Sequence, residues 1–182
     1  MKKTNASIKI EFGDFQTPSP LVNKIISCLK AREFFPLSII EPTCGTGAFV
    51  LALINNFPKA KIIGMDINDN YLQMLKEQIA NKELEGEVVL KQADFFQTDW
   101  EKLIKQLKEP ILVIGNPPWV TSSDISTLKG LNLPKKENLF DFQGLDAKTG
   151  KSNFDISEWM LITLLAALNG HNATLAMLCK VT

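Results

Sequence analysis

Residues 36–67 read PLSIIEPTCGTGAFVLALINNFPKAKIIGMDI and carry the clearest signal of architecture in the chain. A short β-branched run, PLSIIEP, is followed by a glycine turn and the apolar segment GTGAFVLALINNF, and a second β-branched run, AKIIGMDI, comes after it. Short β-branched runs bounded by turn residues predict strands, and the longer apolar segment between them predicts a helix. The stretch therefore predicts one β-α-β unit.

The same alternation continues on both sides of this unit. Before it, residues 17–20 (Thr-Pro-Ser-Pro) provide a cap and early prolines for a helix over LVNKIISCLKA. After it, the pattern predicts a helix at residues 68–82, a strand near GEVVLKQ, a helix near TDWEKLIKQL, a strand PILVIG, a helix near FDISEWMLITLLAAL and a strand ATLAMLC. Strands that alternate with helices predict an α/β fold, with a doubly wound, mostly parallel sheet of the Rossmann-like kind. Ligands of such a sheet bind at the carboxyl ends of its strands.

Composition limits the classes of function. The chain has 182 residues, 45% of them hydrophobic and 22% charged, which suits one α/β domain with a core of its own. Twenty basic residues balance twenty acidic ones, so a contact with nucleic acid must be local or supplied by another part of the protein. No apolar run is long enough for a signal peptide or a membrane span, so we expect a soluble protein.

Cysteine and histidine usage argues against a metal centre. The three cysteines are widely spaced, no CxxC pair is present, and His171 is the single histidine. We expect no structural metal and a reducing, cytoplasmic location. Cys44, although it lies in the glycine turn, is interpreted as a small buried residue, and His171, in the polar turn NGHN, is expected to be exposed.

The glycine turn is a candidate cofactor site. Gly45 and Gly47 let the backbone approach a ligand, and they allow dihedral angles closed to other residues. The turn lacks the GK[ST] of a P-loop, and Val50 stands where a dinucleotide fingerprint has its third glycine. Glu41 would repel a pyrophosphate but could face the ammonium group of an amino-acid tail. This pattern favours S-adenosylmethionine over NAD.

Two further acidic positions follow strands. Asp66 ends the second strand, where a carboxylate can accept hydrogen bonds from ribose hydroxyls, although it could also cap the next helix. Asp94 and Phe95 follow the third strand, where an acid can accept from an adenine amine while the apolar ring packs on the base. A turn-forming Asp94 beside a core Phe95 is the alternative for this pair.

The fourth strand runs directly into Asn116, Pro117, Pro118 and Trp119, the most specific motif of the chain. Two prolines restrict the backbone and remove two amide donors, which leaves carbonyl oxygens aimed in set directions. The Asn116 side-chain oxygen and the Pro117 carbonyl could hold both hydrogens of an exocyclic amine, with the nitrogen lone pair directed at a methyl sulfonium. Trp119 could stack on a base flipped out of the duplex. This motif predicts direct methyl transfer to a planar amine.

Taken in order, these motifs resemble those of class I S-adenosylmethionine-dependent DNA adenine methyltransferases, in the group whose target-recognition domain follows the catalytic motifs. Phe15-Gln-Thr17-Pro18 is similar to that group's amino-terminal cofactor motif. The resemblance implies cofactor contacts at Thr17, Glu41, Gly45, Gly47, Asp66, Asp94 and Phe95, catalytic and target-base contacts at Asn116, Pro117, Pro118 and Trp119, and a residue near the flipped base at Phe154. It also implies DNA as the partner, a restriction-modification role and a nuclease attached or encoded separately.

The chain departs from that group in two respects. Tyr or Phe is the commoner fourth residue of the tetrapeptide, where this chain has Trp119. The group's sheet ordinarily has two further strands and then the recognition domain, whereas this sequence ends at Thr182, after the fifth predicted strand. We therefore expect residues 1–182 to be a catalytic and cofactor-binding core without its recognition domain, as a fragment or as one piece of a split enzyme. Within it, residues 1–16 form a leader, and residues 121–152 form either a mobile flap near DNA or a solvated loop.

Other functions fit the same residues. An Asn-Pro-Pro-aromatic motif also occurs in methyltransferases that act on a protein glutamine amide or on guanine in ribosomal RNA, and a cytosine amine is a further possible target. The Phe-x-Thr-Pro segment favours DNA adenine. In a different class, the chain could be a cofactor-binding core that is inactive alone.

Overall fold

The computed structural model of this chain describes residues 16–119 and 156–179. Nearly all of the predicted leader, the whole of the predicted loop 121–152, and Phe154 lie outside these ranges. Within the described ranges, no helix is long and apolar enough to cross a membrane.

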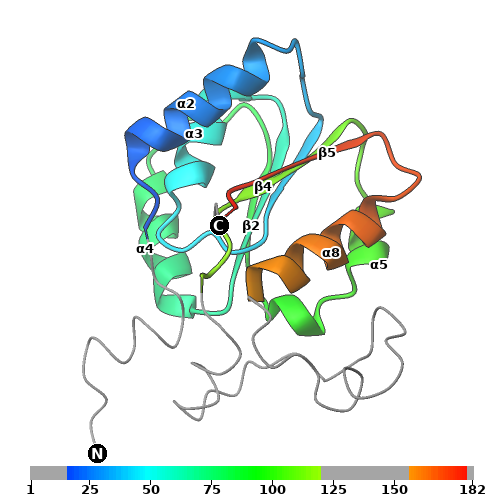
Figure 1. The fold of residues 1–182 in the computed structure, drawn as a ribbon. Coiled ribbons are helices and arrows are strands. Elements are labelled where there is room, and N and C mark those ends of the chain that lie inside the picture. The colour runs from blue at the N-terminus through cyan, green and yellow to red at the C-terminus, as the bar shows by residue number, and fades with distance from the viewer. Residues whose placement is uncertain (1–15, 120–155, 180–182) are drawn as a thin grey trace, which may run out of the picture.

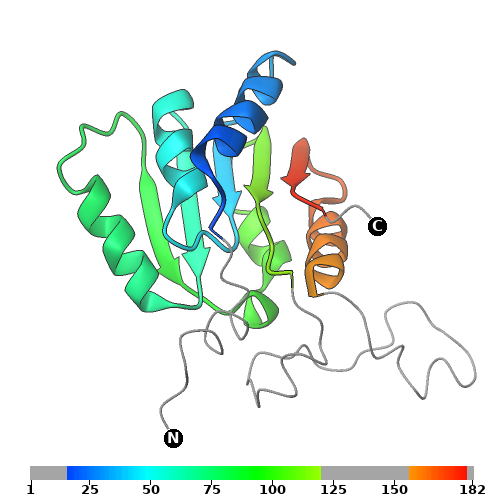
Figure 2. The same ribbon diagram turned by 60° about the vertical axis from the view of Figure 1, so that its left-hand side comes forward.

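A sheet of five parallel strands forms the centre of the molecule. Its order is β3-β2-β1-β4-β5, and every neighbouring pair is parallel (Figure 2). The strands are β1 (Ser38–Glu41), β2 (Lys61–Asp66), β3 (Val88–Gln92), β4 (Ile111–Gly115) and β5 (Ala173–Met177). The predicted doubly wound parallel sheet is confirmed, and all five strands lie where the sequence pattern predicts them.

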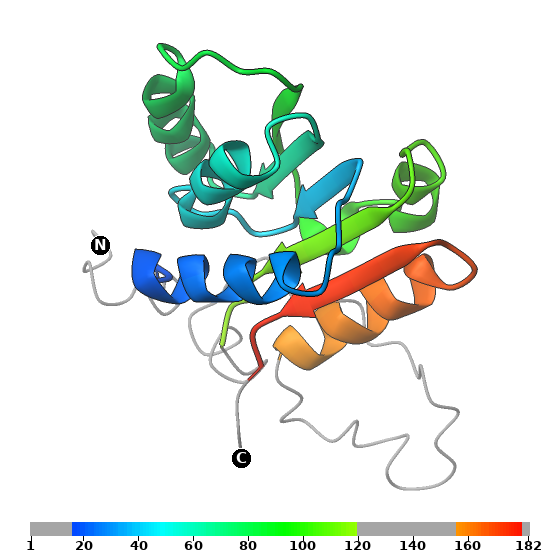
Figure 3. The ribbon, with the colours of Figure 1, turned by 90° about the horizontal axis from the view of Figure 1, so that it is seen from above.

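Helices cover both faces of this sheet (Figure 1). They are α2 (Ser19–Lys30), α3 (Ala48–Asn56), α4 (Asp69–Ile79), α5 (Trp100–Ile104) and α8 (Ile156–Leu168), with a short 3-10 helix, η1 (Phe95–Gln97). Buried residues of α2, α3 and α4 share one hydrophobic cluster with the sheet, and those of η1, α5 and α8 share another. In Figure 3, α8 runs alongside β5, which it contacts.

The alternation of side chains along each strand divides the core between these two clusters. Ile39 of β1 and Ile62 of β2 face the cluster with α2, α3 and α4, whereas the next residues, Ile40 and Ile63, face the cluster with α5 and α8. All four side chains are buried. A parallel sheet covered on both faces needs apolar residues at consecutive strand positions, and this need explains the continuous apolar runs of the sequence.

Several helix ends differ from the prediction; α4, for example, ends at Ile79 and not at residue 82. The N-cap of α2 is Pro18, which makes no side-chain capping bond, so residues 17–20 contribute an early-helix Pro20 but no side-chain cap. The helix predicted over residues 98–107 ends at Ile104 as α5. The amides of Gln106 and Leu107 bond three residues back, in a tighter turn that redirects the chain toward β4.

The strand order places a switch point at the centre of the sheet. From β1 the chain crosses to β2 and β3 on one side, and β4 and β5 lie on the other side. In open α/β sheets, ligands bind at the carboxyl ends of the strands where the order reverses. The loops that follow β1 and β4 meet at this position, and they contain the glycine turn and the Asn116–Trp119 tetrapeptide.

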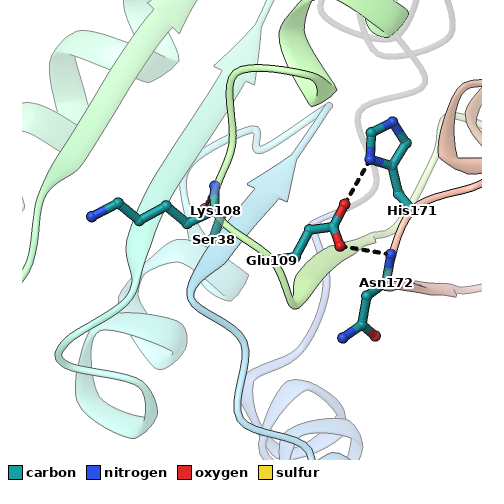
Figure 4. A network of polar contacts seen from close by, with 5 residues as sticks. All are labelled: Ser38, Lys108, Glu109, His171 and Asn172. Carbon is teal, nitrogen blue, oxygen red and sulfur yellow. Dashed lines mark hydrogen bonds and ion pairs between the residues drawn. The ribbon is translucent and has the colours of Figure 1, made fainter.

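At the opposite end of the strands, where they begin, polar contacts join the connection before β4 to the connection before β5 and to the start of β1 (Figure 4). The Glu109 carboxylate accepts a hydrogen bond from Asn172 N at 3.1 Å and lies 2.8 Å from His171 Nδ1. Nearby, the buried hydroxyl of Ser38 accepts from Lys108 N at 3.1 Å. His171, expected to be exposed, is half-buried, because the fold brings it beside a carboxylate 62 positions earlier in the chain.

Candidate active site at the carboxyl ends of the strands

The glycine turn after β1 has the backbone shape that the sequence predicts. Gly45 has φ +51° and Gly47 has φ +91°, both in the left-handed region that favours glycine. A Cβ atom on Gly47 would lie 2.3 Å from Leu75 Cδ1, so this glycine is also required by the packing of α4. Local conformation and tertiary packing therefore both require glycine at position 47.

Hydrogen bonds from neighbouring strands hold the turn in place. Cys44 N donates to Met65 O at 2.8 Å, and Gly45 N donates to Asp66 Oδ2 at 2.7 Å, so the tip of β2 binds two consecutive residues of the turn. Thr43 Oγ1 lies 3.4 Å from Asn116 O, which joins the turn to the segment after β4. The fold thereby brings the predicted cofactor motif and the predicted catalytic motif into direct contact.

Glu41 lies inside the molecule. Its side chain is 2% exposed, and Oε2 accepts a hydrogen bond from Val50 N, in the first turn of α3, at 3.1 Å. Burial is the largest cause of a Glu41 pKa well above its ordinary value, the hydrogen bond from Val50 opposes the rise, and the Asp66 charge adds to it. This position differs from the expected one, in which Glu41 faces a ligand; the carboxyl group instead anchors α3 to β1.

Asp66 is held at the tip of β2 by backbone donors. Its Oδ2 accepts from Gly45 N at 2.7 Å and its Oδ1 from Asn68 N at 2.8 Å. Asp66 is not the N-cap of α4. That position is taken by Asn68, whose side chain accepts a hydrogen bond from Asn70 N. A carboxylate has about four acceptor positions, so a side chain oriented in this way can hold more than two donors.

Asp94 and Phe95 adopt the turn arrangement that the sequence leaves open as an alternative. Asp94 caps η1, with Oδ1 accepting from Phe96 N at 2.9 Å and Oδ2 from Gln97 Nε2 at 3.0 Å. Phe95 is 7% exposed, and its ring centroid lies 4.6 Å from that of Trp100. The ring therefore packs in the core, and Asp94, which is half-buried, is the member of the pair that a ligand can reach.

The tetrapeptide begins immediately after β4. Asn116, Pro118 and Trp119 are half-buried and Pro117 is buried. Trp119 Nε1 donates to Asn116 Oδ1 at 2.7 Å, so the indole group binds the acceptor that the sequence assigns to an amine. No sequence rule predicts this bond, which depends on the conformation of the two prolines between its partners.

Cys44 and Trp100 are both buried, as the sequence predicts. Cys44 is 4% exposed, as expected of a small buried residue, and burial together with the Glu41 and Asp66 charges raises the pKa of its thiol. Trp100, which the sequence places at a core position, is 4% exposed and donates from Nε1 to Phe95 O at 2.9 Å. Neither residue has a reactive setting.

The sequence reasoning overlooked Gln16, Thr43 and Thr46. Gln16 Oε1 accepts from Thr46 Oγ1 at 2.6 Å and lies 3.4 Å from Thr46 N. Thr17, the predicted cofactor residue of the same segment, is half-buried and directly follows Gln16. Gln16 lies inside the quoted Phe15–Pro18 motif, but no spacing rule pairs a residue with a partner 30 positions away.

Comparison with known proteins shows similarity to methyltransferases. Residues 36–109 match the family described as Methyltransferase domain. The chain is 50% identical over 175 residues to the Type II methyltransferase M.NspV of Nostoc sp., covering 94% of this chain and 36% of that protein. It is 28% identical over 120 residues to the Type II methyltransferase M.CvrRI of Paramecium bursaria Chlorella virus XZ-6E, covering 66% of this chain and 28% of that protein.

A relative with another substrate also matches. The chain is 31% identical over 117 residues to the release factor glutamine methyltransferase of Streptococcus pneumoniae, covering 64% of this chain and 38% of that protein. The chain thus spans roughly a third of the length of these three relatives. The chain is therefore similar to methyltransferases over most of its length.

Proposed function

We propose that this methyltransferase chain transfers a methyl group from S-adenosylmethionine to the exocyclic amine of adenine in DNA, as part of a restriction-modification system. The observation that carries the proposal is the meeting of the glycine turn and the Asn116–Trp119 tetrapeptide, joined by Thr43 and Asn116, at the switch point of the sheet. The proposal also draws on the 50% identity to a Type II methyltransferase over nearly the whole chain.

The residues of the turn suit a cofactor of this kind. Residues 41–47 contain no lysine or arginine, so the turn offers no cation for a phosphate group. Glycines with positive φ let the main chain approach a ligand, and Asp66 at the neighbouring strand tip suits the hydroxyls of a ribose. Asp94 and Thr17 complete the proposed binding residues, and Glu41 and Phe95 act from inside the core. When bound, S-adenosylmethionine supplies an electrophilic methyl group.

The tetrapeptide suits an amine that is a poor nucleophile. The nitrogen lone pair of adenine N6 is delocalised into the ring, so an acceptor must draw it out of that conjugation. We assign this to Asn116 Oδ1 and the Pro117 carbonyl, which accept the two amine hydrogens and hold the nitrogen in line with the methyl group. With the cofactor bound, the nitrogen–carbon bond would form as the sulfur–carbon bond broke, and the amine would then release one proton to water. Trp119 stacks on the flipped base.

The test separates cofactor binding from chemistry. We expect Asp66→Ala to remove S-adenosylmethionine binding in calorimetry. We expect Asn116→Ala to keep that affinity and to lose methyl transfer to a duplex rich in adenine, with Asn55→Ala on the exposed side of α3 as the matched control. Equal loss of affinity and activity in Asn116→Ala would overturn the assigned roles.

The same experiment also tests which substrate the protein methylates, because one relative is a glutamine methyltransferase. A protein substrate with an accessible glutamine is offered beside the DNA duplex, since a glutamine amide is also a planar nitrogen that needs two acceptors. Transfer to adenine alone supports the proposal. Transfer to the glutamine alone would reassign the substrate while leaving the cofactor site in place.

A further inference from the structure

We propose that Gln16 is a positioning residue for the cofactor: through Thr46 it holds the glycine turn in the shape that accepts S-adenosylmethionine. The inference rests on the proposed function, because it takes the turn at residues 45–47 as the cofactor site. Its basis is the contact between Gln16, which precedes α2, and Thr46, which lies between the two glycines.

The contact has three parts. Gln16 Oε1 accepts from the Thr46 hydroxyl at 2.6 Å and lies 3.4 Å from the Thr46 amide nitrogen. The amide group of Gln16 also lies over Gly45, since a Cβ atom built there would be 3.3 Å from Gln16 Nε2 and 3.4 Å from Oε1. One side chain therefore binds the residue between the glycines and covers the first of them.

The turn needs such a contact because of its two glycines. Glycine loses more conformational freedom on ordering than any other residue, and a ligand that must order the turn itself binds less tightly. Met65 and Asp66 of β2 bind Cys44 and Gly45 from one side. Gln16 binds the next residue, Thr46, from the amino-terminal segment, so the turn is held from two separate parts of the chain before any ligand arrives.

The same bond joins two motifs that are 30 residues apart. Thr17, a proposed cofactor residue, directly follows Gln16, and α2 begins at Ser19. The hydrogen bond between Gln16 and Thr46 therefore also restricts the position of Thr17 relative to the turn. Loss of the bond should loosen both motifs together and leave the tetrapeptide after β4 in place.

The experiment is a double-mutant cycle read out by the S-adenosylmethionine dissociation constant in calorimetry. Gln16→Leu and Thr46→Val each remove the bond at nearly constant volume, and we expect each to weaken affinity by about three- to tenfold, the range of one hydrogen bond. The double variant should be no weaker than either single variant, because both remove the same interaction. Thr46→Ser keeps the hydroxyl group and should restore the affinity.

Gln73→Leu is the matched control. Gln73 Nε2 makes an exposed bond to Asp69 Oδ2 at 3.3 Å on α4, so the same chemical change is made away from the turn. We expect its affinity to equal that of the wild type. We also expect the melting midpoint without cofactor to fall no further in Gln16→Leu than in this control. In Gln16→Leu, KM for the cofactor should rise while kcat stays nearly unchanged.

Each outcome decides the matter. Additive losses, or an unchanged affinity in Gln16→Leu, would overturn the role of Gln16, and if Asp66→Ala still removed binding, the proposed cofactor site would stand without it. A fall in melting midpoint with no change in affinity would show a purely structural bond and would also overturn the inference. A wild-type protein that does not bind S-adenosylmethionine would overturn the proposed function, and this inference with it.

Discussion

Gly47 shows how one residue can satisfy two requirements at once. The sequence motif calls for glycine because the turn needs an unusual backbone angle, and the structure confirms this with φ +91°. The same position is closed to a side chain by Leu75 of α4, and this contact cannot be predicted from the motif. The backbone requirement is local, whereas the packing requirement arises only when α4 folds onto the turn.

Substitution of this glycine should therefore cost more than its backbone angle alone. Gly47→Ala places a side chain in the left-handed region, at about 1–2 kcal/mol, and adds overpacking of about 1–3 kcal/mol against Leu75. Gly170→Ala is the matched control, since Gly170 has φ +83° and no atom lies within 4 Å of its would-be Cβ. Urea unfolding measures both, and an equal loss in the two variants would show that the contact with Leu75 relaxes freely.

A hydrogen bond joins Trp119 to Asn116 within the tetrapeptide. The indole N–H donates to Asn116 Oδ1, and an amide oxygen has a second lone pair for an amine hydrogen. We expect the bond to orient Asn116 for the substrate. Trp119→Phe, which keeps an aromatic ring and removes the donor, should lower kcat about three- to tenfold.

Single-turnover methylation measures this effect, with Trp119→Ala as the variant that also loses the ring. A Trp119→Phe protein faster than the wild type would mean the opposite, that the indole competes with the substrate amine for Asn116. Either result distinguishes the bond from stacking, because the aromatic ring is retained.

At the scale of elements, Glu41 joins β1 to α3. Its buried carboxyl group accepts from Val50 N, and burial raises the Glu41 pKa well above its ordinary value of 4.5. A carboxyl group with a raised folded pKa favours folding most below its unfolded pKa, and this contribution is lost as pH rises through the folded pKa. The junction should therefore be more stable in mild acid than in base.

Glu41→Gln keeps an acceptor for Val50 N and cannot ionise. Measured by urea unfolding without cofactor, its stability relative to the wild type should rise between about pH 5 and about pH 8, because only the wild type has a carboxylate to bury. A relative stability that falls over this interval would mean that ionised Glu41 stabilises the fold.

The two ends of α5 differ in how well the nearby sequence predicts them. Asp99 caps the helix by accepting from Lys102 N at 2.9 Å, and the sequence places a helix start close to this residue. The helix ends at Ile104, earlier than predicted, and the chain then turns toward β4, where Lys108 N bonds Ser38 Oγ. No local pattern predicts this contact with a strand that lies 70 positions earlier in the chain.

At the scale of the whole molecule, the carboxyl ends and the amino ends of the strands contain different groups of polar residues. Apart from Thr17, the proposed cofactor and catalytic residues lie at the carboxyl ends of strands or directly after them. The cluster of Glu109, His171 and Asn172 lies just before β4 and β5 (Figure 4). The hydrogen bonds to His171 and Asn172 lower the Glu109 pKa. A lowered folded pKa gives stability that is present above the unfolded pKa and is lost as pH falls through the folded pKa.

We therefore expect His171→Ala to lower the melting midpoint at neutral pH and to leave the S-adenosylmethionine affinity unchanged. The difference in melting midpoint should shrink in acid, as Glu109 becomes protonated in both proteins. Differential scanning calorimetry with and without cofactor gives both readouts. A loss of affinity in this variant would show that the two ends of the strands are coupled.

The sequence alone determined the α/β class, all five strands, the glycine turn and the tetrapeptide that follows β4, because each depends on local patterns: β-branched runs, apolar spacing, and glycine or proline at a turn. Tertiary structure alone decided that Glu41 anchors α3, that Phe95 packs on Trp100, and that Gln16 binds Thr46. These contacts join side chains brought together by the order β3-β2-β1-β4-β5, in which helices cover both faces of the sheet.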